Sequence, residues 1–108
     1  MSIIGITTTL NNIEKGYVDL SFGRCEYFLI LNTEKTSFEF YENIYKKNKD
    51  NAGIDSIEFL KQKGVDMIIT GNIGSKVMEC IDRYKIRLII AKENNLKLDN
   101  IIKKLKLN

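Results

Sequence analysis

The sequence predicts an α/β fold with a five-stranded mixed sheet, and three observations lead to this prediction. Residues 65–74 form a near-continuous apolar run that stops in a glycine-bracketed turn. Helical periodicity lies on both sides of the run, which is typical of a parallel strand covered on both faces. Before residue 43, three strand-like segments follow one another without a helix. The resulting order, β-β-β-α-β-α-β-α, implies a sheet that is antiparallel in its first part and parallel in the rest.

The first half of the chain contains the three strand-like segments. Residues 3–9 are rich in β-branched side chains and predict a central strand, whereas 10–21 are mainly loop. Residues 26–31 and 36–41, separated by a short polar stretch, predict an antiparallel hairpin whose second strand has one solvated face. Residues 43–51 are rich in asparagine and lysine and predict a mobile loop.

The second half alternates helices with strands. Ile54, Ile57 and Leu60 recur every three residues, and Gly64 can accept the left-handed conformation that follows a helix. Similar apolar spacing recurs around residues 77–84 and again, with acidic and basic residues placed to match the helix dipole, near the carboxyl terminus. The predicted elements are a helix over 53–63, a strand over 65–70, a helix over 77–84, a strand over 86–91 and a helix over 98–105.

Composition narrows the class of protein. A chain of 108 residues with 44% hydrophobic content predicts one domain over residues 1–108. Two cysteines without a zinc-like spacing, no histidine, and no apolar stretch near about 18 residues indicate a cytoplasmic protein without a membrane span. The net charge of +3 comes from the second half, where lysines lie on expected helix backs without interleaved aromatics. This pattern disfavours nucleic acid as a partner.

The turn at residues 71–74 is the first candidate ligand site. Gly71 and Gly74 bracket Asn72 and Ile73 at a strand-to-helix junction, where the backbone can approach a ligand and helix N–H groups favour an anion. In the alternative interpretation the glycines only form a tight turn, and Asn72 or Ser75 caps the helix.

The second candidate is the segment Phe22-Gly23-Arg24-Cys25, just before the second strand. Its guanidinium offers directional hydrogen bonds, and a nearby cation lowers the pKa of a thiol toward the metal-ligating thiolate. In the alternative interpretation Cys25 is a small buried hydrophobe. Cys80, within a predicted helix, is expected to pack in the core.

Catalysis is not predicted. The chain has no histidine to act as a base, and neither the first strand nor the end of the 65–70 strand carries a carboxylate for a catalytic metal. A single G-x-x-G is neither a P-loop nor a dinucleotide fingerprint. We therefore expect a binding protein rather than an enzyme.

The chain resembles the dinitrogenase iron–molybdenum cofactor family, the group of NifX, NafY and the carboxy-terminal domain of NifB. The matching stretches are Phe-Gly-Arg-Cys-Glu-Tyr-Phe at 22–28, Ala-Gly-Ile at 52–54, the spaced residues from Leu60 to Gly74, and Lys-Ile-Arg-Leu at 85–88. The resemblance implies a ribonuclease H-like three-layer α/β/α fold and a role linked to nitrogen fixation. It also implies that the two glycine-bearing turns lie at the same edge of the sheet.

By this resemblance the protein binds or carries an iron–sulfur or iron–molybdenum-type cluster, or its precursor, and delivers it to a protein partner. The residues expected to bind it are Phe22, Gly23, Arg24, Cys25, Gly71, Asn72, Ile73 and Gly74, with Cys25 as the metal ligand. Asp19-Leu20-Ser21 stands where family members often have a histidine, so Cys25 would need other ligands beside it. The alternative is a small regulatory or interaction module that uses the same fold without a cofactor.

Overall fold

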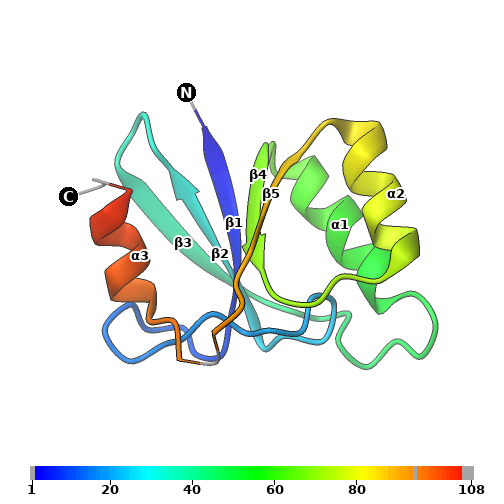
Figure 1. Cartoon of the computed structure of the whole chain (residues 1–108), viewed down its shortest axis with the longest axis horizontal. Helices are drawn as coiled ribbons and strands as arrows, with labels where there is room; N and C mark the ends of the chain where they lie inside the picture. Colours follow the sequence, from blue (N-terminus) through cyan, green and yellow to red (C-terminus); the bar gives the residue numbers. More distant parts are fainter. Residues whose placement is uncertain (1, 94, 106–108) are drawn as a thin grey trace.

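A computed structural model describes residues 2–93 and 95–105 of the chain. Five strands and three helices follow one another in the predicted order (Figure 1). Their bounds are β1 Ile3–Thr8, β2 Tyr27–Asn32, β3 Ser37–Glu42, α1 Ala52–Gln62, β4 Met67–Thr70, α2 Ser75–Tyr84, β5 Arg87–Ile90 and α3 Leu98–Lys104.

The five strands form one mixed sheet in the order β3-β2-β1-β4-β5. β1 is central, as its β-branched composition predicts. It pairs antiparallel with β2 and parallel with β4, and β5 extends the parallel part. The prediction of an antiparallel first part and a parallel second part is therefore confirmed. In this topology the carboxyl ends of β1 and β4 and the amino end of β2 lie at one edge of the sheet.

Helices cover both faces of the sheet. In Figure 1, α1 and α2 lie together on one side and α3 lies on the other. The buried apolar side chains form two clusters, one on each face of the sheet, and successive residues of β4 belong to different clusters. Ile68 packs under α1 and α2, whereas Ile69 faces α3. Alternating side chains point to opposite faces of a strand. The apolar run in β4 is thus explained by burial on both faces, as predicted.

The ends of the elements differ from the predictions by one or two residues, and the start of β4 has a clear cause. The Val65 N–H donates to the Leu60 carbonyl at 3.1 Å, so this residue closes α1 instead of joining the sheet. Gly64 adopts the predicted left-handed conformation, with φ 81°. β4 is therefore only four residues long, and the turn at 71–74 comes directly after its buried residues.

β3 is more exposed than the hairpin prediction implied. Its side chains alternate, but Phe38 is 55% exposed and Glu39 is also exposed, so both faces of the strand are partly solvated. α1 covers only one end of β3, where Phe59 packs against Tyr41 with ring centroids 5.5 Å apart. Of the described helices, none is long and apolar enough to cross a membrane.

We expect Cys80→Ser to lower the free energy of unfolding by about 1–3 kcal/mol, because Cys80 lies on the buried face of α2 and a serine oxygen would be too far from the Arg83 guanidinium, 3.9 Å from the present Sγ, to be well bonded. Met78→Ser, on the same helix but at a position 36% exposed, is the matched control and should cost less. Urea denaturation of both variants measures the difference. Equal losses would contradict the assignment of Cys80 to the core.

Candidate functional site

The two glycine-bearing turns are joined by main-chain hydrogen bonds. The Asn72 N–H donates to the Leu20 carbonyl at 2.5 Å, and the Phe22 N–H donates to the Asn72 carbonyl at 3.4 Å. Ser21 and Asn72 form an isolated parallel bridge. Segments fifty residues apart in sequence therefore meet at the edge where β4 ends and β2 begins. We call residues 20–25 and 71–76 together the glycine-turn site.

Close backbone approach explains three glycines around this site. A Cβ on Gly71 would lie 2.5 Å from the Cα of Leu20, and one on Gly23, where φ is 85°, would lie 2.9 Å from the Cα of Gly53. A Cβ on Gly53 would in turn lie 2.6 Å from a methyl group of Val77. These contacts pack the 20–25 segment against the turn after β4 and the first turn of α1, and pack α1 against the first turn of α2. Gly23 and Gly71 therefore serve packing, without direct access to a ligand.

The first turn of α2 is open to solvent. Gly74 is the N-cap residue with extended backbone angles, and no side chain caps the helix. The alternative in which Asn72 or Ser75 acts as the cap is therefore wrong. A Cβ on Gly74 would meet no atom within 4 Å, so there is free space beside this turn. Uncapped N–H groups at a helix start favour anions, and the exposed Lys76 adds positive charge.

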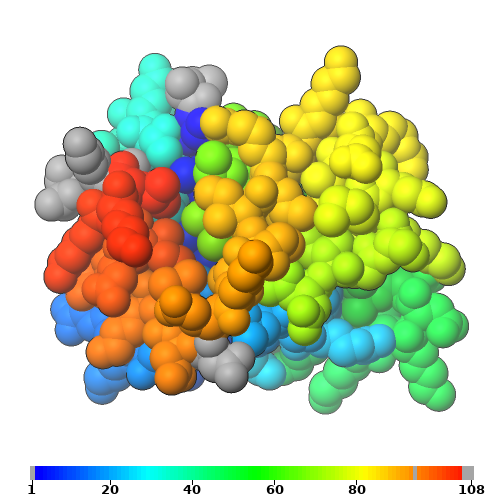
Figure 2. All heavy atoms as spheres, viewed as in Figure 1, coloured from blue at the N-terminus to red at the C-terminus, as the bar shows by residue number. Residues whose placement is uncertain are grey.

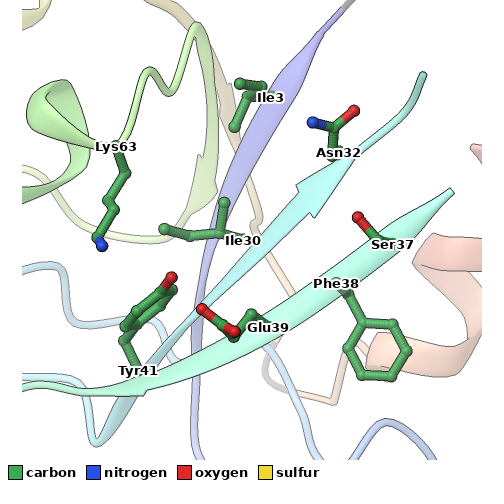
Figure 3. Close-up of a pocket in the computed structure, with 8 residues that line it drawn as sticks. All are labelled: Ile3, Ile30, Asn32, Ser37, Phe38, Glu39, Tyr41 and Lys63. Atoms are coloured by element: carbon green, nitrogen blue, oxygen red, sulfur yellow. The ribbon is translucent and has the colours of Figure 1, made fainter. Parts of the chain in front are cut away.

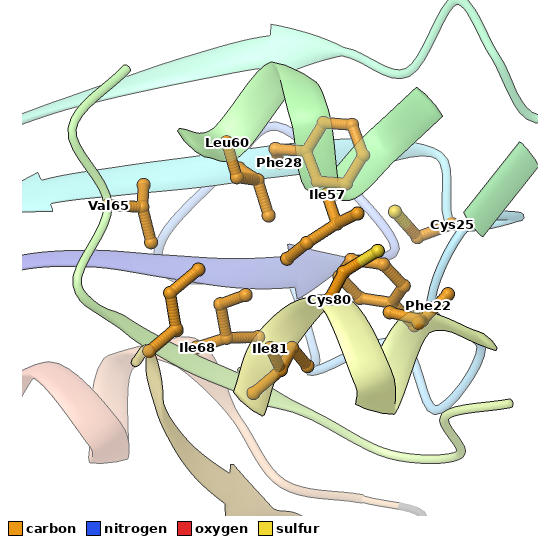
Figure 4. Packing of buried hydrophobic residues seen from close by; sticks show 11 residues of the cluster. Phe22, Cys25, Phe28, Ile57, Leu60, Val65, Ile68, Cys80 and Ile81 are labelled. Atoms are coloured by element: carbon orange, nitrogen blue, oxygen red, sulfur yellow. The ribbon is translucent and has the colours of Figure 1, made fainter. Parts of the chain in front are cut away.

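Cys25 is fully buried, as the alternative interpretation of a small buried hydrophobe predicts. It lies in the cluster between the sheet and helices α1 and α2, together with Phe22 and Ile57 (Figure 4). Burial, with a smaller effect from the negative charge of Asp19, raises the pKa of the thiol from 9.0 to about 12. A metal-ligating thiolate at neutral pH requires the opposite shift. The ligand role of Cys25 stays a prediction, and it would require the surrounding loop to open.

Arg24 points away from Cys25 and holds the connection between β3 and α1. Its guanidinium donates to the carbonyls of Lys46 at 2.7 Å and Lys49 at 2.9 Å. The expected pairing of a thiol with a guanidinium is therefore not present in this conformation, because neighbouring residues entering a strand point to opposite sides. Arg24 therefore holds the loop that contains Lys46 and Lys49 next to the 20–25 segment.

Asn43 is the residue that the sequence analysis missed. It is 1% exposed, and its Nδ2 donates to the carbonyls of Gly23 at 2.9 Å and Cys25 at 3.0 Å and lies 3.6 Å from the Cys25 Sγ. Its Oδ1 accepts from the Tyr45 N–H. One buried amide thus shapes the turn around Cys25. An asparagine after a strand favours a turn, but nothing in its neighbours indicates this long-range role.

The eight predicted binding residues divide into two groups. Four are buried in the packing beneath the site, while the others are exposed or half-buried on its surface. The buried ones are Phe22, Gly23, Cys25 and Gly71; the accessible ones are Arg24, Asn72, Ile73 and Gly74. A ligand at this site would therefore meet backbone N–H groups and the Asn72 amide rather than a thiol. Among the described residues, no group of three or more Cys, Asp or Glu side chains is placed to hold a metal ion.

A separate hollow of about 290 Å³ lies at the other end of β2 and β3 (Figure 3). Its charged groups lie beside Tyr41, since the Lys63 Nζ stands 4.7 Å from the centre of the Tyr41 ring and the Glu39 carboxylate acts on the Tyr41 hydroxyl. The neighbouring Glu39 carboxylate raises the pKa of Tyr41. The hollow shares no residue with the glycine-turn site, so it does not add to a cluster site there.

Comparison with known proteins adds family information to this geometry. The model of the family described as dinitrogenase iron–molybdenum cofactor matches residues 3–108. An uncharacterised protein of Methanocaldococcus jannaschii is 31% identical over 94 residues, which cover 84% of this chain and 78% of that protein.

Two solved structures share the fold. The apo form of the orange protein from Desulfovibrio gigas superposes with a TM-score of 0.86 at 22% identity, covering 98% of this chain and 88% of that one. The NMR structure of a proposed NifB protein from Thermotoga gives a TM-score of 0.77 at 23% identity, with the same coverage of both chains. At these identities the likeness concerns the arrangement of strands and helices.

We expect Gly71→Ala and Gly74→Ala to differ sharply in stability. The first places a methyl group against the Leu20 backbone and should cost about 1–3 kcal/mol, whereas the second enters open space and should change the free energy of unfolding by less than about 0.5 kcal/mol. Thermal denaturation followed by circular dichroism measures both. Comparable losses would show that the two segments are not packed as described.

We expect the Cys25 thiol to make folding pH-dependent in alkaline solution. Its pKa is about 12 in the folded chain against 9.0 when unperturbed, so above pH 9 the unfolded state loses this proton first and stability falls. The loss should approach about 1.4 kcal/mol per pH unit between these two values. Urea midpoints of wild type and Cys25→Ala, compared at pH 8 and pH 10, isolate the thiol from other titrating groups. A constant difference between the two proteins would contradict the raised pKa.

Proposed function

Because the chain belongs to the dinitrogenase iron–molybdenum cofactor family, we propose that it is a non-catalytic cytoplasmic carrier of a metal–sulfur cluster or its precursor. Its cargo would be an iron–sulfur or iron–molybdenum-type cluster, and its partner the protein that receives it. In this proposal the chain forms one domain with the ribonuclease H-like α/β/α architecture. The family name supports the class of cargo, and the geometry supports the place where it binds.

One observation carries the placement of the cargo. The two glycine-bearing turns, which the resemblance had placed together, are hydrogen-bonded to each other beside the uncapped first turn of α2. Gly74 leaves open space there, and N–H groups and Lys76 provide positive potential without a thiolate. Metal–sulfide clusters are commonly anionic, so this surface suits a cluster that brings its own sulfide ligands.

The proposed binding surface for the cluster is therefore the accessible part of the glycine-turn site. It is formed by Asn72, Ile73 and Gly74, with Arg24 at its rim. The buried residues Phe22, Gly23 and Gly71 would support this surface from beneath. Cys25 would become a direct ligand only if the Asn43 amide released the carbonyls of residues 23 and 25 and the loop opened. The two binding modes, one without a protein thiolate and one with Cys25 exposed by loop opening, predict different metal retention in a Cys25 variant.

A second candidate is an interaction module that uses the fold without a cofactor. The observation that favours it is the burial of both cysteines together with the lack, among residues 2–93 and 95–105, of any cluster of metal-ligating side chains. Fe–S clusters in proteins usually depend on several thiolates. The experiment on the carrier proposal also tests this alternative.

We expect the purified chain to retain metal after anaerobic incubation with ferrous iron, molybdate and sulfide, followed by gel filtration. Visible absorbance should scale with protein-bound metal, and Gly74→Val should reduce the retained metal at least about tenfold by filling the open space, at a cost of about 1 kcal/mol or less for this N-cap change. Ser37→Val, at an exposed position on the opposite end of the sheet, is the matched control and should retain metal as wild type does.

Cys25→Ala separates the two binding modes. Retained metal in this variant supports binding through backbone and side-chain N–H groups, whereas loss of metal in a folded protein shows that the thiol becomes a ligand. A wild-type chain that leaves the column without metal, at every ratio tried, contradicts the carrier proposal and favours the interaction module. Circular dichroism of each variant verifies that it is folded.

A further inference from the structure

The two outer strands of the sheet differ in how they are protected against pairing with another strand. β3 carries two exposed carboxylates, Glu39 and Glu42, among its six residues. β5 carries only aliphatic side chains after Arg87. Outer strands that lack charges, prolines or bulges are open to addition of a further strand. Apart from its shortness and Arg87, β5 has none of these features, so it is the less protected edge of the sheet.

The side chains of β5 are exposed to an unusual degree for their type. Ile89 is 46% and Ile90 is 42% exposed, and Figure 2 shows the β5 segment at the surface between α3 and α2. Arg87 does not shield them. Its guanidinium donates to the Ser2 hydroxyl at 2.7 Å and lies 3.6 Å from the carboxylate of Asp66, the residue before β4.

A hollow beside Ile89 adds apolar surface to this edge. It has about 210 Å³ and separates β5 from α3 on the face of the sheet that α3 covers only in part. Its lining is mostly aliphatic, with one amide and one ammonium group, and consists of Ile69, Ile89, Leu96, Asn100, Ile101, Lys104 and Leu105. A partner strand at this edge could place an apolar side chain in the hollow.

The backbone of β5 defines how such a partner would pair. The Arg87 N–H donates to the Asp66 carbonyl and the Ala91 N–H to the Thr70 carbonyl, so these residues bond inward to β4. Successive residues of a strand alternate in direction. Leu88 and Ile90 therefore point their N–H and C=O groups outward from the sheet.

We propose that β5 pairs antiparallel with β5 of a second copy of this chain, about a two-fold axis at Ile89. In this register Leu88 of each copy is opposite Ile90 of the other, so every outward N–H and C=O group of these two residues finds a partner. The two Ile89 side chains meet at the axis, beside the hollow of each copy. Lys85 just before β5 and Glu93 just after it lie outside the paired residues, so opposite charges of the two copies would flank the interface at both ends.

Neighbouring registers are less complementary. An axis at Leu88 would pair Ile90 with Ile86, whose N–H is already bonded to the Ile81 carbonyl at 3.0 Å. An axis at Ile90 would place Leu88 opposite the lysine at position 92. An interface with the same patch on both subunits is the usual form of a dimer. With only four residues in each strand, the dimer should be weak and concentration-dependent.

Sedimentation velocity of the purified chain from about 10 μM to about 1 mM tests the dimer. We expect wild type to shift toward the dimer as concentration rises. Ile89→Lys and Ile89→Glu should each weaken association at least about tenfold, because like charges would meet at the axis. An equal mixture of the two variants should restore association, since position 89 faces itself across the interface. Ile44→Lys, at a loop position 72% exposed, is the matched control and should associate as wild type does.

Cysteine substitution tests the register independently of charge. Opposed residues of a non-hydrogen-bonded antiparallel pair are close enough for a disulfide, so oxidised Ile89→Cys should give a covalent dimer while Ile90→Cys should not. The native thiols are buried and should not interfere. A wild type that stays monomeric at the highest concentration, or a mixture that fails to restore association, overturns the proposal and leaves the edge for a heterologous strand. Equal cross-linking at both positions would overturn the register.

Discussion

The main-chain pairing of Asn72 with Leu20 and Phe22 is the contact on which the organisation of the glycine-turn site depends. It joins the turn after β4 to the segment before β2 across the carboxyl end of β1. Buried backbone groups must find partners, and here two loops satisfy each other where no strand continues. The close approach requires glycine at position 71. The open first turn of α2 begins directly after this contact, at Gly74.

Most of the fold could be predicted because hydrophobic periodicity is a local property. The apolar run in β4, the apolar spacing in α1 and the left-handed glycine after that helix can each be recognised from a few neighbouring residues in the sequence. The exposure of β3 was harder to predict, because alternation along a strand does not say how much of a sheet the neighbouring helices cover. α1 reaches only one end of β3, and that depends on helix placement rather than on β3 itself.

The candidate site was predicted in its location but not in its chemistry. The order of the motifs placed both glycine-bearing turns at one edge, and their hydrogen bonds agree with that placement. Whether Cys25 faced solvent or the core depended on Asn43, eighteen residues away, whose amide bonds the carbonyl beside the thiol. A cysteine between glycine and strand is compatible with both environments. Only the long-range contact distinguishes them, and a single sequence does not reveal it.

The glycine packing around this edge reverses the usual pattern of mutational tolerance. Surface loops ordinarily accept substitutions that helices and strands reject. Here the loop glycines at 23 and 71 touch backbone atoms of other segments, where even one added methyl group has no room. Exposed positions on α2, such as Lys76 and Glu79, have no such constraint. A library of random variants would therefore lose folded protein at these two loop glycines as it does in the core, and sequence drift at positions 23 and 71 should be slower than in an ordinary surface loop.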